Sequence, residues 1–220
     1  MTRRIAAVIF DLDGVLVDTG IWWDEVRQAF AAAHGRSWTV EDRAQVMGAN
    51  SRQWSRTMRE RLNLDGSAEE IERDVVGAMV SRWRTDPSPL IAGADDVVRR
   101  LAAEYPLAVA SSAHRDVIDA SLAFTALRSF FRVVVSSDEV AHGKPAPDVY
   151  LEAARRLDVQ PGQCIVVEDS LNGVLSGRAA GMTVVLVPNA MIPPAPGARE
   201  AANLVLDDLR QLDLRRIGSA

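Results

Sequence analysis

The sequence has little that would tie it to an oxidising compartment, a membrane or a nucleic acid. Cys164 is the single cysteine, so no intramolecular disulfide can form and a reducing cytoplasm is the expected compartment. The first apolar run, Ile5–Phe10, stops at Asp11 and is too short for a signal sequence or a membrane span. With 25 basic and 30 acidic residues, the net charge is −5, so we expect no nucleic-acid or membrane partner. Any anionic ligand must be held by local groups.

What the 220-residue chain does contain is a set of short apolar runs rich in Val and Ile. They are too continuous to alternate between a buried and an exposed face, which is typical of parallel strands covered on both sides. Segments with helical spacing lie between them, and this alternation predicts an α/β fold with a doubly wound parallel sheet. The predicted strands are Ile5–Phe10, Leu107–Ala110, Arg132–Val135, Cys164–Val167 and Thr183–Val187, and the predicted helices are Ala94–Glu104, Asp116–Leu122, Asp148–Leu157 and Leu171–Ala180.

One long stretch breaks the alternation of strand and helix. Between the first two predicted strands the sequence offers only helical patterns, followed by the turn-rich segment Thr85–Pro89. A connection of about seventy residues with its own helices is easier to explain as an inserted domain than as a loop. We therefore expect residues 1–17 and 88–220 to form the α/β core and residues 18–87 a helical cap domain. The predicted insert helices are Trp22–His34, Val40–Val46, Gln53–Leu62 and Glu69–Trp83.

Polar residues follow four of the predicted strands, where the ligands of an open parallel sheet collect. Four carboxylates at one edge would repel one another strongly unless a cation compensated them. Because only oxygen ligands are offered, and too few for a dedicated calcium cage, Mg²⁺ sharing its shell with water and a substrate phosphate is the natural choice. A serine hydroxyl and a lysine can then bind the phosphoryl oxygens. The residues are Asp11, Asp13, Ser111, Ser112, Lys144, Glu168 and Asp169.

Four motifs in this order carry a family resemblance: Phe10–Thr19, Ala110–Ser112, Gly143–Asp148 and Val167–Ser170. The chain resembles the haloacid dehalogenase superfamily, and within it the branch with a helical cap that includes β-phosphoglucomutase and phosphoglycolate phosphatase-like enzymes. The resemblance implies that a phosphoryl group is transferred to a catalytic aspartate and then to water.

The resemblance also implies a role for each matched residue. Asp11 would be the nucleophile, Asp13 the acid and base, and Ser111 and Lys144 the catalytic residues that bind the phosphoryl group. Mg²⁺ would be held by Asp11, the backbone carbonyl of Asp13, Asp169 and, directly or through water, Glu168.

Further substrate contacts are expected from residues around these motifs. Ser112 follows Ser111, and His114 and Arg115 begin a predicted helix, whose amides and dipole favour an anion. Arg52 could supply a cation from the cap. The tryptophans, by contrast, are expected mainly to build a small core of the insert, with the alternative that some of them face the substrate; they are Trp22, Trp23, Trp38, Trp54 and Trp83.

The substrate is expected to be a small phosphorylated metabolite, such as a sugar phosphate or a phosphoglycolate-like monoester. A β-phosphoglucomutase-like phosphosugar mutase is the alternative, but Trp23 stands where such mutases carry a gating histidine, and its indole has no acceptor nitrogen with which to hold Asp13. A non-catalytic protein on the same fold would be expected to lack a catalytic carboxylate, and none is missing. The sequence leaves the substrate's identity and the oligomeric state open.

Overall fold

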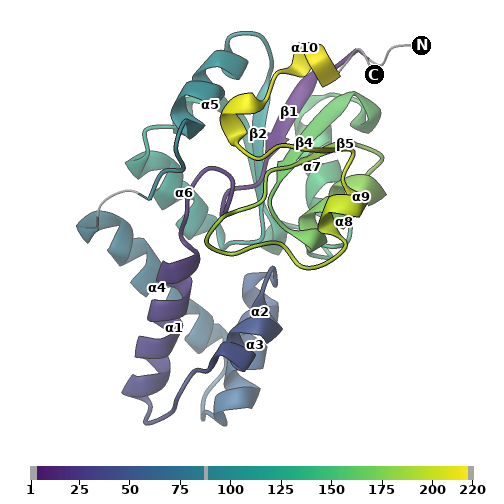
Figure 1. Cartoon of the computed structure of the whole chain (residues 1–220). Coiled ribbons are helices and arrows are strands. Elements are labelled where there is room, and N and C mark those ends of the chain that lie inside the picture. Colours follow the sequence, from purple (N-terminus) through teal and green to yellow (C-terminus); the bar gives the residue numbers. More distant parts are fainter. Residues whose placement is uncertain (1–3, 87–88, 218–220) are drawn as a thin grey trace.

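The computed structural model describes residues 4–86 and 89–217, so the predicted boundary at residues 87 and 88 lies outside the described residues. Its centre is a parallel sheet with the strand order β3-β2-β1-β4-β5-β6 (Figure 1). The five predicted strands are confirmed, with ends shifted by at most two residues; β6 was not predicted. The strands are β1 (Ala7–Phe10), β2 (Leu107–Ser111), β3 (Phe131–Ser136), β4 (Cys164–Glu168), β5 (Thr183–Leu186) and β6 (Leu204–Val205).

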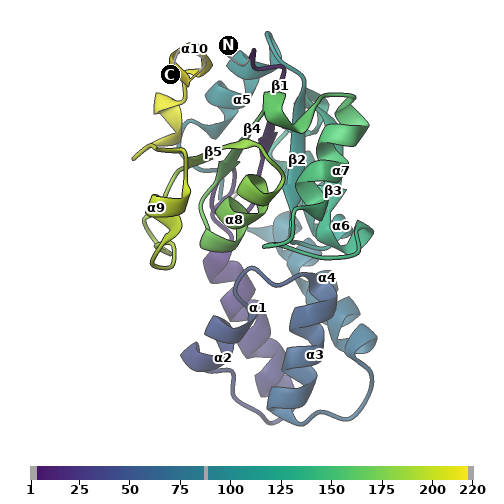
Figure 2. The ribbon, with the colours of Figure 1, turned by 90° about the vertical axis from the view of Figure 1, so that its right-hand side faces the viewer.

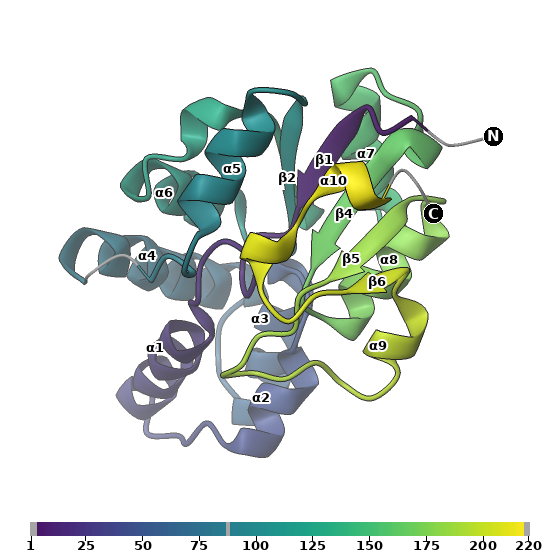
Figure 3. The same ribbon diagram turned by 45° about the horizontal axis from the view of Figure 1, so that its top comes forward.

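Helices cover both faces of the sheet, which explains why the strand sequences are apolar without alternation. Figure 3 shows α5 (Ala94–Ala102) and α6 (Arg115–Phe124) on one side of the strands, and α7 (Asp148–Leu157) and α8 (Leu171–Ala179) on the other. Every residue of β1 is fully buried, with Val8 and Phe10 in one hydrophobic cluster and Ala7 and Ile9 in the other. The chain ends with two short helices, α9 (Ala198–Ala201) and α10 (Leu214–Ile217).

A group of helices lies between β1 and α5 in the sequence and below the sheet in Figures 1 and 2. Its members are α1 (Gly20–Ala33), α2 (Val40–Val46), α3 (Ser51–Leu62) and α4 (Ala68–Thr85). Thr39, Asn50 and Ser67 form capping boxes at the starts of α2, α3 and α4. As predicted, tryptophans build the core of this helical insert: Trp22, Trp38, Trp54 and Trp83 are buried, whereas Trp23 is only partly buried. No described helix is long and apolar enough to cross a membrane.

Gly14 forms the turn after β1 and lets it approach the loop after β4. Its φ angle is +86°, in the region that favours glycine, and a Cβ atom there would lie 1.9 Å from Oδ2 of Asp169. Gly173, at the start of α8, plays the same part for Glu168, because its Cβ would lie 1.7 Å from Oε1. The two glycines therefore make room for two carboxylates.

Replacing Gly14 by Ala should lower the free energy of unfolding by more than the roughly 1–3 kcal/mol that a left-handed non-glycine residue costs. The added methyl group also collides with Asp169. Gly35→Ala is the matched control, since Gly35 has a φ of +67° but nothing within 4 Å of its would-be Cβ. Urea unfolding should show Gly14→Ala as clearly the less stable variant, and equal stabilities would contradict this account.

Candidate active site

The carboxyl ends of β1 and β4 lie side by side and place two acidic residues together. The register pairs Phe10 with Val167, and the amide of Asp11 donates to the Val167 carbonyl at 2.9 Å. Asp11 thus follows β1 level with Glu168, the last residue of β4. The neighbouring strand β2 ends at Ser111, which is also buried.

Lys144 reaches these strand ends from the loop that precedes α7. Its Nζ donates to Oδ1 of Asp11 at 2.5 Å and to Oε1 of Glu168 at 2.6 Å, and only 4% of its side chain is exposed. Burial alone would lower the pKa of Lys144, but the charges of Asp11 and Glu168 raise it well above its ordinary value. Lys144 is therefore a buried ammonium that joins two carboxylates.

Glu168 is a fully buried carboxylate with an unusually complete set of donors. Lys144 and the Tyr150 hydroxyl, at 2.9 Å, donate to Oε1, while the amides of Asp169 and Ser170 and the Ser170 hydroxyl donate to Oε2. Burial raises the pKa of Glu168, but the charge of Lys144 and these hydrogen bonds outweigh it and hold the pKa below its ordinary value. Glu168 is thus stable as an anion.

Two nearby carboxylates lack such compensation. One oxygen each of Asp11, Glu168 and Asp169 lie within 4.8 Å of one another. Burial raises the pKa of Asp11 to about 8, with Lys144 opposing the shift and Glu168 adding to it. Burial and the charges of Glu168 and Asp11 raise the pKa of Asp169 well above its ordinary value. A compact group of carboxylate oxygens short of positive charge fits a hard divalent cation.

Asp13 also lies at this edge, but its side chain is not part of the carboxylate group. It accepts a hydrogen bond from the Thr19 hydroxyl and one from Trp23. Burial raises the pKa of Asp13, and these two hydrogen bonds act against that rise. Trp23 can therefore hold Asp13 without an acceptor nitrogen, because a carboxylate is held by a donor and the indole N–H is one.

A cavity of about 160 Å³ lies between the strand ends and the helical insert. Its core side contains the predicted residues Asp11, Asp13, Ser111, Ser112, Lys144, Glu168 and Asp169. The insert contributes Trp23, Arg27 and Trp54. Arg27 was not predicted to line a site, whereas the tryptophans were expected mainly to pack in the insert, with some of them left open as substrate contacts. The loop after β5 contributes Asn189, whose amide donates to Asp18 at 3.2 Å and ties this loop to the start of the insert.

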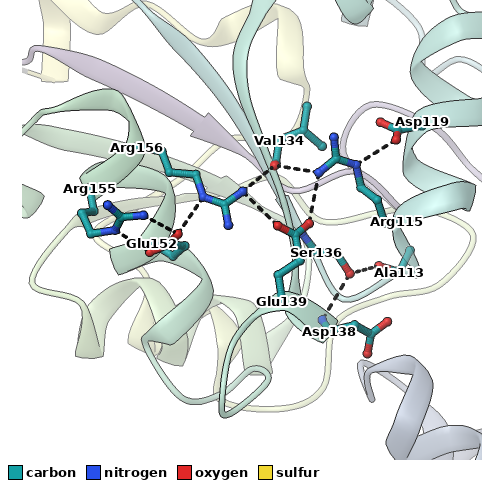
Figure 4. Close-up of polar contacts among 10 residues, drawn as sticks. All are labelled: Ala113, Arg115, Asp119, Val134, Ser136, Asp138, Glu139, Glu152, Arg155 and Arg156. Carbon is teal, nitrogen blue, oxygen red and sulfur yellow. Dashed lines mark hydrogen bonds and ion pairs between the residues drawn. The ribbon is translucent and has the colours of Figure 1, made fainter.

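Arg115, a predicted substrate contact, lies outside this cavity. Figure 4 shows its guanidinium between Asp119, at 2.8 Å, and Glu139, at 3.1 Å. It also donates to the Val134 carbonyl, and Glu139 is shared with Arg156. Arg115 therefore belongs to an ion-pair network beside β3. Its positive charge, which was expected to face a substrate, is paired with Asp119 and Glu139 instead.

Arg52 and His114 likewise do not line the cavity. Arg52 donates to the Asp138 carbonyl at 3.1 Å, a contact between the insert and the α/β core. The His114 ring caps α6 by accepting from the amide of Asp116, and its Nε2 lies 3.8 Å from Glu72 of α4. Both were predicted as substrate contacts from their charge and local setting, and both instead contact other protein groups.

Comparisons with known proteins find relatives that are named as phosphatases. The chain is 30% identical over 220 residues to the bifunctional riboflavin kinase/FMN phosphatase of Arabidopsis thaliana; the match covers 99% of this chain, which spans only 57% of that protein's length. It is 32% identical over 187 residues to fructose-1-phosphate phosphatase of Escherichia coli, covering 84% of this chain and 97% of the relative.

The solved structure of CbbY from Rhodobacter sphaeroides in complex with phosphate has the same fold. Its TM-score is 0.82 at 26% sequence identity, over 94% of this chain and 96% of that one. Residues 5–181 match the haloacid dehalogenase-like hydrolase family, a stretch that runs from β1 to the end of α8 and contains all four motifs. The chain therefore belongs to the haloacid dehalogenase-like hydrolase family.

Proposed function

We propose that this protein is a magnesium-dependent phosphatase that hydrolyses a small phosphorylated metabolite through an aspartyl-phosphate on Asp11. The observation that carries the proposal is the buried contact of Lys144 with Asp11, beside a group of carboxylates in a cavity. Relatives named as phosphatases of phosphorylated compounds support it. The comparisons do not favour the mutase alternative over a phosphatase.

In this proposal Asp11 attacks the phosphorus atom. Lys144 holds Oδ1, which leaves Oδ2 to form the new bond to phosphorus while the bond to the leaving oxygen breaks. Asp13 gives its proton to the leaving oxygen, and a pKa raised by burial suits that task. Asp13 then takes a proton from the water that attacks phosphorus, which releases phosphate and restores Asp11.

The phosphoryl oxygens would be bound by Lys144 and Ser111. The Ser111 hydroxyl oxygen accepts a hydrogen bond from the Ala113 amide at 3.1 Å, which orients it and leaves its proton free for the phosphate. Mg²⁺ would be held by Asp11, Asp169, Glu168 and the backbone carbonyl of Asp13, and its charge would reduce the repulsion between carboxylate and phosphate.

We also propose that residues 18–87 act as a cap domain on an α/β core of residues 1–17 and 88–220. The basis is the cavity, whose walls come from both parts. A wall supplied by an inserted domain would keep water from the aspartyl-phosphate except where Asp13 activates it.

Asp11→Asn should lower kcat for phosphate release by at least about 10³-fold, the order that loss of a catalytic nucleophile costs. The fold should remain intact, because the amide keeps the shape of the side chain. Steady-state assays of inorganic phosphate release check this, with Asp119→Asn as control, since Asp119 pairs with Arg115 outside the cavity. A near-wild-type kcat of the Asp11→Asn enzyme would refute the assignment of Asp11 as the nucleophile.

Magnesium should stabilise the protein more at pH 8 than at pH 6. Without metal the folded pKa values of Asp11, Asp13 and Asp169 are raised, so their contribution to stability is largest at low pH and is lost as pH rises toward these values. The cation replaces those protons, so its effect grows as they leave. Thermal denaturation with Mg²⁺ or EDTA measures the difference.

The control for this titration is Asp169→Asn, which should lose most of the magnesium-induced rise in Tm at both pH values. A rise of the same size at pH 6 and pH 8 in the wild-type protein would contradict the assigned carboxylate cluster.

A further inference from the structure

Arg27 stands out in the wall that the helical insert gives to the cavity. It lies on α1, and only 8% of its surface is exposed. Its Cζ is 4.9 Å from the ring centroid of Trp23 and 5.4 Å from that of Trp54. The guanidinium is therefore buried against two indole rings that line the same cavity.

Among the described residues, no anion is bound to this cation. Within residues 4–86 and 89–217 its guanidinium makes no hydrogen bond or ion pair, and its Nε is buried without a partner. Arg43, another arginine of the cavity wall, differs in this respect, because it pairs with Asp24 at 3.4 Å. Burial lowers the pKa of Arg27 to about 10, with the more distant charges of Asp24 and Asp13 opposing the shift.

A buried, unpaired guanidinium is costly unless a ligand satisfies it. Its planar fork of N–H donors matches the two oxygens of a carboxylate or phosphate, whereas a neutral hydroxyl leaves the charge unbalanced. Lys144 and Ser111 stand at the strand ends, on the core side of the cavity, and Arg27 stands on the insert side. A ligand that spans the cavity can therefore place its phosphoryl group against Lys144 and Ser111 and a second group against Arg27.

We propose that Arg27 selects substrates whose leaving group carries a second oxyanion, either a carboxylate or another phosphate. This inference rests on the proposed phosphatase function and adds a substrate class to it. Arg27 is a specificity-determining residue in this proposal, since it contacts the leaving group away from the reacting phosphorus.

The test uses pairs of phosphate esters that differ in the second anionic group. Phosphoglycolate against ethylene glycol monophosphate tests a carboxylate, and fructose 1,6-bisphosphate against fructose 1-phosphate tests a phosphate. The wild-type enzyme should favour the charged member of at least one pair by about 10- to 100-fold in kcat/KM, the range expected for a hydrogen bond to a charged group. The pair that shows the preference identifies the oxyanion.

Arg27→Met should abolish this preference by raising KM for the charged ester much more than KM for the neutral ester. Arg27→Lys keeps the charge but loses the planar fork, so it should retain part of the preference. This variant provides the test if Arg27→Met does not fold. Arg82→Met is the matched control: Arg82 also lies in the insert, with its Cζ 4.9 Å from the Trp22 centroid, but does not line the cavity. Its preference should equal that of the wild type.

Three results would overturn the inference. One is wild-type hydrolysis with no preference in either pair, which leaves the phosphatase proposal standing. Another is an Arg27→Met enzyme in which kcat falls equally for both members of a pair, since Arg27 would then act by positioning Asp13. The third is no magnesium-dependent release of phosphate from any of the four esters, which would overturn the proposed function as well.

Discussion

The contact of Lys144 with Asp11 and Glu168 determines what the carboxyl ends of this sheet can hold. An ammonium with 4% of its side chain exposed is stable there because two carboxylates surround it, and its charge opposes the rise that burial imposes on the pKa of both carboxylates. Glu168 receives its remaining hydrogen bonds from Tyr150 and the loop after β4, and these donors stabilise its ionised form. Asp11 and Asp169 are left with raised pKa values, and this deficit of positive charge is what a divalent cation would fill.

Much of the fold could be predicted because burial on both faces leaves a clear mark on sequence. The runs at β1 and β4 are apolar at every position up to Phe10 and Val167, and polar residues begin where the strands end. The Pro, Ser and Asp residues around residue 86 marked the end of the helical insert in the same way. By contrast, β6 has two half-buried residues and forms by pairing with the edge of β5. This is a tertiary contact that no local sequence pattern predicts.

The two walls of the cavity also differ in whether local sequence patterns predict them. Residues at strand ends could be placed together from sequence, because neighbouring parallel strands end at one edge. The cavity wall of the insert could not, since it depends on how α1 packs against α3. Arg27 is one helical turn after Trp23, the only local sign that the two share a face, and its burial follows from Trp54 on another helix. Arg115 lies outside the cavity for a similar reason: its local setting suits an anion, but its guanidinium pairs with Glu139, which is distant in sequence.

The central claim is that a phosphoryl group passes through Asp11, and chemical trapping tests it most directly. The enzyme would be mixed with Mg²⁺ and a hydrolysed ester, quenched with acid during turnover, reduced with borohydride and digested for mass spectrometry. We predict that the peptide containing Asp11 carries homoserine at that position, the product of reducing an aspartyl-phosphate. An unmodified Asp11 in enzyme quenched at full turnover, with a label on another residue, would contradict the account.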